Sequence, residues 1–117
     1  MNNERVFAMS FAAVYPHYVA KVEMKGRSVA ELHEVIEWLT GYDEAGLAEV
    51  LEDRRSFRDF FDKAPNYTQN AHLITGTVCG IRVENIEDPL MQKIRFLDKL
   101  VDELAKGKKM EKILRKA

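Results

Sequence analysis

Residues 88–107 read DPLMQKIRFLDKLVDELAKG, and this stretch carries the clearest structural signal in the chain. Asp88 is a good N-cap, and Pro89 suits the first helical position, where the N–H that proline lacks would have no helical partner. Gly107 is a natural stop, so the stretch predicts a helix over 89–106, about 27 Å long at 1.5 Å per residue. The apolar residues recur at alternating steps of four and three, which puts them on one face: Leu90, Ile94, Leu97, Val101 and Leu104.

Three shorter helices have clear beginnings upstream. Ser28-Val29-Ala30-Glu31 is a capping box, in which the serine hydroxyl and the glutamate carboxylate satisfy backbone N–H groups reciprocally. It predicts a helix over 29–40 that ends at Gly41. Asp43 is expected to cap the next helix. Ser56 is expected to cap a short one, which must end before Pro65.

The two ends of the chain also favour helices. The N-terminal region predicts one helix over 4–14 and a second over 16–25, with a non-helical Tyr15 between them, because the residue before a proline disfavours helical geometry. A short basic helix is expected over 108–115.

The segment 73–83 is ambiguous. Its β-branched residues favour a strand, but no other segment resembles a strand that could pair with it. Asn70 could cap a helix over 71–79 and Gly80 could end it, so we predict a helix there. The expected fold class is then all-α: residues 1–117 form a single compact domain of short helices packed on a long C-terminal helix.

Composition excludes several classes of protein. The 117 residues fit one domain, and 18 basic against 19 acidic residues argue against a dedicated nucleic-acid binder. The single cysteine, Cys79, excludes an intramolecular disulfide and a cysteine-rich zinc site. No apolar stretch reaches the ~20 residues needed to cross a bilayer, and an acid early in the chain is unlike a secretory signal. We therefore expect a cytoplasmic protein whose thiol is reduced.

Stretches spread over nearly the whole chain resemble a bacterial family called domain of unknown function 2200. They are RVFAMSF (5–11), VYP (14–16), WLTGY (38–42), HLITG (72–76), VCG (78–80), RVE (82–84), IEDPLM (86–91) and LDKLV (97–101). The resemblance implies a small, mainly helical bacterial protein. It implies no activity, cofactor or catalytic residue.

The residues themselves suggest a small-molecule site in the ambiguous segment. His72, Thr75, Cys79 and Arg82 place polar and small groups close together in sequence, and we treat them as candidate ligand-binding residues. Helical spacing would keep His72 out of reach of Cys79, so a Cys–His dyad would need His17 or His33. The plainer interpretation is a buried Cys79 between Gly76 and Gly80, with the glycines allowing close contact between helices.

Other candidate sites have weaker support. His33 and Glu37 share a helix face and could supply two metal ligands, but no third is evident, so we expect neither a metal nor a cofactor. An aromatic set could line a pocket or belong to the core: Tyr15, His17, Tyr18, Trp38 and Tyr42. The basic tail, residues 106–116, could contact phosphates or an acidic membrane surface, form a solvated helix end, or dock on the more acidic body of the protein.

Two functional hypotheses result. The first is a binding or interaction module without enzymatic activity, whose partner is an unidentified protein or small molecule. The apolar stripe of residues 90–104 would either be buried internally or complete a homodimer. The alternative is a small-molecule-binding protein or enzyme with its site around His72, Thr75, Cys79 and Arg82. Charge-balanced composition gives no reason to expect nucleic acid as a partner.

Overall fold

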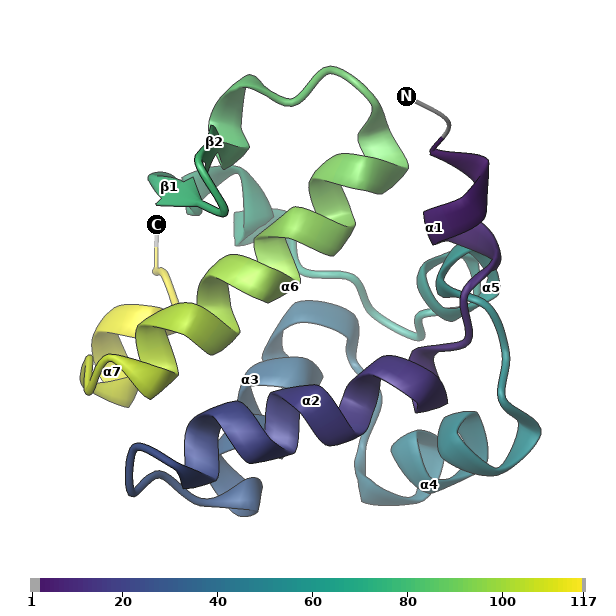
Figure 1. The fold of residues 1–117 in the computed structure, drawn as a ribbon, viewed down its shortest axis with the longest axis horizontal. Helices are drawn as coiled ribbons and strands as arrows, with labels where there is room; N and C mark the ends of the chain where they lie inside the picture. The colour runs from purple at the N-terminus through teal and green to yellow at the C-terminus, as the bar shows by residue number, and fades with distance from the viewer. Residues whose placement is uncertain (1–2, 117) are drawn as a thin grey trace.

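Helix α6 (Pro89–Ala105) crosses the middle of the molecule and the other elements pack around it (Figure 1). The computed structural model describes residues 3–116. The predicted start of α6 is confirmed, because Asp88 accepts a hydrogen bond of 2.9 Å from the backbone N–H of Met91 and Pro89 opens the helix. Its apolar face is buried within the molecule, so most of the stripe that could have completed a dimer is already covered: Ile94, Leu97, Leu100, Val101 and Leu104.

The remaining helices surround α6. They are α1 (Glu4–Ala8), α2 (Phe11–Glu23), α3 (Val29–Thr40), α4 (Glu44–Asp53), α5 (Phe57–Asp62) and α7 (Met110–Ile113). Helices α2 and α3 pack against α6 and against each other, α1 packs on α5, and α7 folds back on the end of α6 (Figure 1). The predicted all-α class is confirmed. None of the described helices is long and apolar enough to cross a membrane.

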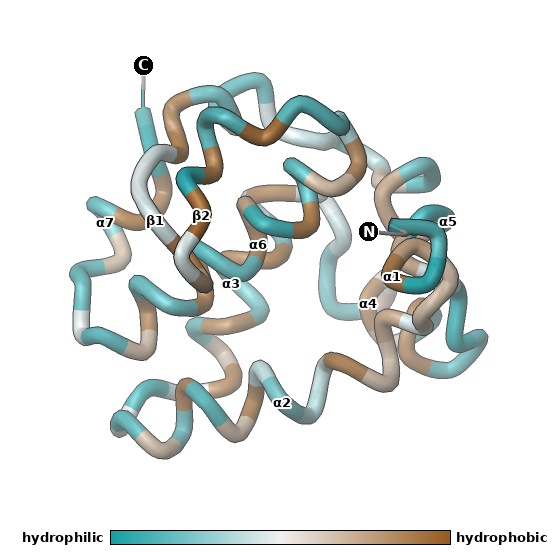
Figure 2. The backbone as a smooth tube through the Cα atoms, turned by 45° about the horizontal axis from the view of Figure 1, so that its top comes forward, coloured by the Kyte–Doolittle hydropathy of each residue, from teal (hydrophilic) through white to brown (hydrophobic). Residues whose placement is uncertain are grey.

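An aromatic cluster fills one end of the core. Phe60 is fully buried, stacks on Phe11 with 4.1 Å between ring centroids, and contacts Tyr42 and Phe61 at 4.9 Å each. The Tyr42 hydroxyl donates a hydrogen bond of 2.7 Å to the Phe60 carbonyl, which satisfies both groups away from water. Hydropathy along the backbone alternates on α2 and α6, as one-sided burial of these helices requires (Figure 2).

The predicted helix boundaries of the middle region are confirmed. Ser28 and Glu31 form the capping box of α3, and Gly41 ends it in the left-handed conformation. The Arg27 guanidinium, helped by the backbone N–H of Ser28, lowers the pKa of Glu31 to about 2. Asp43 and Ser56 cap α4 and α5 as expected.

The predicted break at Tyr15 is wrong. Tyr15 and Pro16 both lie inside α2, and the chain bends earlier, where Ser10 caps α2 by accepting a hydrogen bond from Ala13. The segment before α2 is fixed by a bridge to Ser56, in which the Phe57 N–H donates to the Met9 carbonyl. Burial of the inner face of α2 outweighs the local preference of the residue before a proline.

The predicted helix over 71–79 is also wrong. The segment forms a 3-10 helix, η1 (Gln69–Leu73), and then two short antiparallel strands, β1 (Thr77–Val78) and β2 (Ile81–Arg82). A second 3-10 helix, η2 (Val83–Asn85), leads toward α6. The partner of strand β1 is the next strand in the chain, β2, because the two are joined by a two-residue turn. Cys79 and Gly80 both have positive φ, 53° and 77°, which suits the tight turn of a hairpin.

Candidate functional site: the Trp38 cleft

Beside helix α3 lies a polar cleft of about 680 Å³ that we call the Trp38 cleft. This volume lies within the usual range of ligand pockets, about 300–1,000 Å³. Three segments that are far apart in sequence form it: the outer face of α3, the stretch 66–70, and the C-terminal segment after α7. Its lining residues are Glu34, Glu37, Trp38, Asn66, Thr68, Gln69, Asn70 and Leu114.

Helix α3 forms the first wall because its sequence is amphipathic. One face of α3 is fully buried, including Val35 and Leu39. The positions between them turn Glu34 and Glu37 to solvent and leave Trp38 half-buried at the border. The cleft therefore presents an indole beside two carboxylates.

The second wall is fastened to the end of α3 by the backbone. The N–H of Asn66 donates to the Thr40 carbonyl at 3.0 Å, and the N–H of Thr68 donates to the Leu39 carbonyl at 2.9 Å. This approach requires Gly41, because a Cβ there would lie 2.6 Å from the Asn66 nitrogen. The same glycine that ends α3 thus allows Asn66 to lie against the end of the helix.

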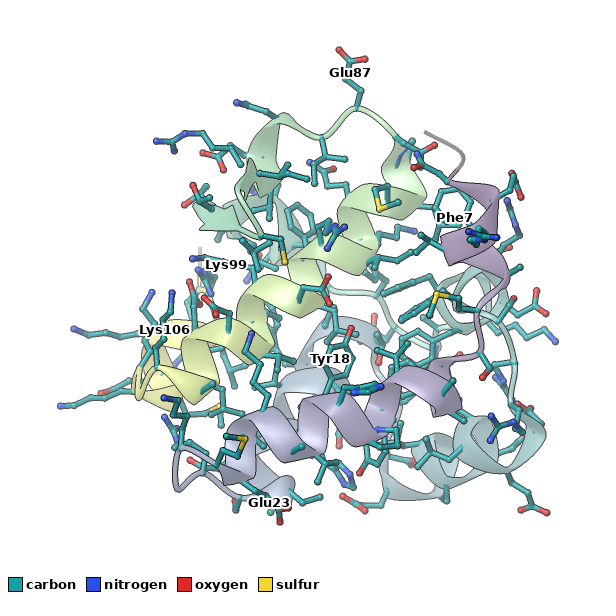
Figure 3. All side chains as sticks on the ribbon, in the orientation of Figure 1. Phe7, Tyr18, Glu23, Glu87, Lys99 and Lys106 are labelled. Atoms are coloured by element: carbon teal, nitrogen blue, oxygen red, sulfur yellow. The ribbon has the colours of Figure 1, made fainter. Side chains whose placement is uncertain are left out.

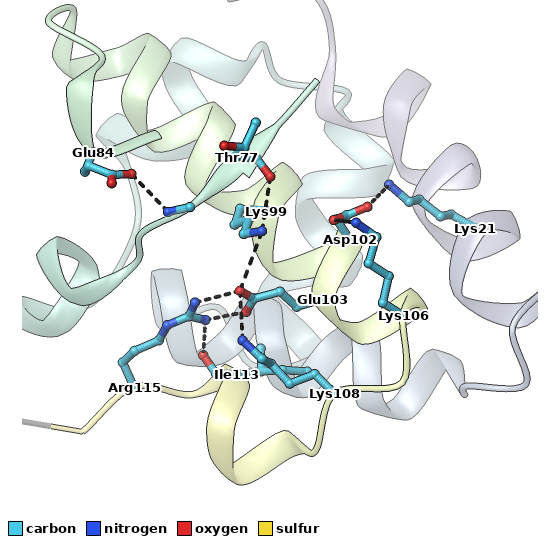
Figure 4. Close-up of polar contacts among 11 residues, drawn as sticks. Lys21, Thr77, Glu84, Lys99, Asp102, Glu103, Lys106, Lys108, Ile113 and Arg115 are labelled. Atoms are coloured by element: carbon cyan, nitrogen blue, oxygen red, sulfur yellow. Dashed lines mark hydrogen bonds and ion pairs between the residues drawn. The ribbon is translucent and has the colours of Figure 1, made fainter. Parts of the chain in front are cut away.

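The third wall is held by polar contacts of the C-terminal segment. The Asn70 amide donates to the Arg115 carbonyl at 3.1 Å, which places Leu114 at the cleft. The Arg115 guanidinium in turn donates to the Glu103 carboxylate, with 2.7 Å between Nη2 and Oε2 (Figure 4). Lys108 donates to the same carboxylate at 3.2 Å. Glu103 is only 5% exposed, so this pair anchors the wall from the interior.

The chemistry of the lining is that of recognition. The aromatic face of Trp38, the carboxylates and the amides can stack on a ligand and hydrogen-bond to it. No group of three or more potential metal-ligating side chains occurs within residues 3–116.

None of the predicted ligand-binding residues lines the Trp38 cleft. His72, Thr75, Cys79 and Arg82 are all exposed. His72 lines a neighbouring hollow of about 370 Å³, and its Nδ1 lies 2.8 Å from the Gln69 carbonyl oxygen. Arg82 is paired with Glu84 at 3.4 Å. A ligand-binding role for these four residues remains a prediction.

Cys79 lies at the turn of the hairpin, against a small hollow of about 220 Å³ between α2 and α6. The expectation that it is buried between two glycines of a helix is wrong, since the thiol is exposed and the glycines lie in turns. His17 lines the same hollow. Beside it, Tyr18 donates a hydrogen bond of 2.7 Å to Asp98, and burial raises the pKa of Tyr18 well above its usual value (Figure 3).

The fold can now be compared with known proteins. The family model described as "Uncharacterized protein conserved in bacteria (DUF2200)" matches residues 5–115. This chain belongs to the DUF2200 family. It is also similar to a solved structure described as "Crystal structure of uncharacterized protein SP1917", with 47% identity over 97% of this chain and 93% of that one, and a TM-score of 0.88. No curated protein matches.

Membership of DUF2200 confirms the resemblance found in the sequence, and neither comparison assigns an activity. Of the aromatic set, only Trp38 lines the cleft of this family member. Tyr18 and Tyr42 belong to the core, and the Tyr15 hydroxyl is hydrogen-bonded to His33. His33 contacts Glu44 through Nδ1 at 2.8 Å.

Sequence reasoning missed the second wall of the cleft. The signal was the run Asn66-Tyr67-Thr68-Gln69-Asn70, in which four of five residues are amides or hydroxyls on short side chains. Such a run usually forms a loop. Its position beside α3 depends on a tertiary contact, the close approach of the Asn66 backbone to Gly41, which local sequence does not reveal.

Proposed function

We propose that this protein is a binding module that holds a small molecule in the Trp38 cleft. The observation that supports it is the construction of the cleft. Three separate segments line the cleft around one half-buried indole. Backbone hydrogen bonds hold the stretch 66–70 against the end of α3, and the Asn70 amide holds the C-terminal segment. Ligand sites are usually preformed hollows in which aromatic side chains and a few placed polar groups meet.

The intrinsic fluorescence of Trp38 provides the first test, because it is the only tryptophan in the chain. Native mass spectrometry of the freshly purified protein would show a co-purified ligand, and a panel of amines, sugars and carboxylic acids would then be titrated. We expect one class to change the intensity or wavelength of the emission saturably. Calorimetry with the Trp38→Phe variant should show at least about tenfold weaker binding, since an aromatic anchor carries a large share of such affinities. The proposal fails if no bound mass is found and no class is bound.

We also infer that the chain forms one domain and functions in the cytoplasm. The helices share one core around α6, which supports the first inference. The free, exposed thiol of Cys79 supports the second, because such a thiol persists best in a reducing compartment.

Nucleophilic chemistry at Cys79 is the second candidate function. The observation that favours it is that His17, from a different helix, lines the hollow beside the thiol. If this arrangement activates Cys79, an aromatic disulfide reagent should react with the folded protein several-fold faster than with the urea-unfolded chain. The His17→Asn variant should remove that advantage, whereas the control His72→Asn should keep it. A folded thiol that reacts no faster than the unfolded one contradicts this candidate.

A further inference from the structure

The Trp38 cleft carries negative charge that no described residue neutralises. Glu34 and Glu37 lie three positions apart on α3 and line the same cleft as Trp38, and both are exposed. Across residues 3–116, no cation forms an ion pair with either carboxylate and no group donates a hydrogen bond to it. Elsewhere on the same helix Glu31 does have a cation, since Arg27 contacts it at 2.8 Å.

The surroundings do not supply the missing positive charge. The lining contains no lysine, arginine or histidine. Arg115 follows Leu114 in the chain, but its guanidinium is engaged by Glu103 and by the Ile113 carbonyl. Lys116 forms no ion pair with either carboxylate. The electrostatic potential in the cleft is therefore expected to be negative.

The uncharged groups of the lining also favour one ligand chemistry. An indole face attracts cations electrostatically, and tryptophan does so better than tyrosine or phenylalanine. The side-chain amides of Asn66 and Gln69 make no hydrogen bond with the rest of the described chain, so their oxygens are available to accept from N–H donors. An anion would be repelled by the two carboxylates, and a neutral donor would gain hydrogen bonds from them without the attraction between opposite charges.

We propose that the Trp38 cleft binds an organic cation, with a guanidinium or alkylammonium group held between the indole face of Trp38 and the carboxylates of Glu34 and Glu37. This inference rests on the proposed binding function and names the class of its ligand. A guanidinium fits the site best, because its plane can stack on the indole while its N–H groups donate to both carboxylates and to an amide oxygen.

The test compares butylguanidinium with butylurea, which has nearly the same shape but no charge. Both are titrated into the full chain, with Trp38 fluorescence and calorimetry as independent measurements. We expect the cation to bind at least about tenfold more tightly than the urea, a difference of about 1.4 kcal/mol. Binding should weaken as salt is raised from about 20 mM to about 500 mM, because salt screens the attraction between exposed charges.

The variants separate the role of these two carboxylates from a general effect of charge. The double variant Glu34→Gln, Glu37→Gln should lose about tenfold in affinity for butylguanidinium and keep its circular dichroism, because both side chains are exposed. The matched control is Glu87→Gln, since Glu87 projects into solvent from the segment before α6 (Figure 3). This control should bind as the wild type does.

The outcomes distinguish a failure of the cation proposal from a failure of the proposed binding function. Equal binding of butylguanidinium and butylurea, or full affinity in the double variant, overturns the cation proposal and leaves the binding function standing. The same holds if only sugars or carboxylic acids from the earlier panel bind. If nothing binds in either experiment, both proposals fail. Where the cation does bind, acetyl-Gly-Arg-Gly-amide identifies its source: tighter binding than butylguanidinium indicates an arginine of a polypeptide, and weaker binding a free small molecule.

Discussion

Replacing Phe60 by alanine is expected to lower the free energy of unfolding by about 3–5 kcal/mol, a large part of the total stability of a domain this size. Phe60 is fully buried, and its ring touches those of Phe11, Tyr42 and Phe61. It thereby joins α2, the segment before α4, and α5 itself. The ring cannot be removed without leaving a cavity, since these neighbours are tied to different parts of the chain.

Urea unfolding followed by circular dichroism would measure this loss. Phe60→Leu should cost less than Phe60→Ala, because leucine fills part of the space, although the ring contacts are lost. The control Met24→Ala removes a large apolar side chain that is 82% exposed, and it should change stability by no more than about 0.5 kcal/mol. A Phe60→Ala protein as stable as the Met24→Ala control would show that the aromatic cluster is not central to the core.

The sequence predicted those parts of the fold in which local signals agree with tertiary packing. Asp88, Pro89 and the apolar stripe set α6, and Ser28 with Glu31 set the start of α3. Local reasoning failed at Pro16, where burial of one face of α2 outweighs the preference of the residue before it. It failed again at residues 77–82, because the turn requires a non-glycine residue, Cys79, with positive φ, which residue preferences do not suggest.

The candidate site was harder to predict than the fold. Trp38 was noticed as one of several aromatic residues, but nothing local distinguishes it from Tyr42, which is buried in the core. Trp38 differs because residues 66–70 lie beside its helix and form a cleft there. Their close approach to the end of α3 depends on the absence of a side chain at Gly41. The four residues singled out as ligand-binding, His72, Thr75, Cys79 and Arg82, were grouped by closeness in sequence, and two of them, His72 and Cys79, line different hollows.

The buried carboxylate of Glu103 holds the basic tail on the body of the protein, and its removal is expected to lower stability strongly. Glu103 is buried and accepts hydrogen bonds from Arg115 and Lys108, while Lys99, 4.0 Å away, also donates to the Thr77 carbonyl of the hairpin (Figure 4). The Glu103 carboxylate thus ties the residues on both sides of α7 to α6, and Lys99 ties the hairpin to the same helix. Removing the carboxylate leaves Arg115, whose side chain is only 14% exposed, without a counter-charge.

We therefore expect Glu103→Ala to lower the free energy of unfolding by about 3–5 kcal/mol, the usual cost of removing one partner from a buried ion pair. The matched control is Glu111→Ala, which removes an exposed glutamate of α7 and should cost no more than about 0.5 kcal/mol. Because Arg115 also accepts the Asn70 hydrogen bond through its carbonyl, loss of Glu103 should loosen the Leu114 wall of the Trp38 cleft. Backbone amides of residues 113–116 should then exchange with deuterium faster than in the Glu111→Ala control. Unchanged exchange there, together with unchanged stability, would show that the tail is held by the packing of Ile113 alone, which is fully buried.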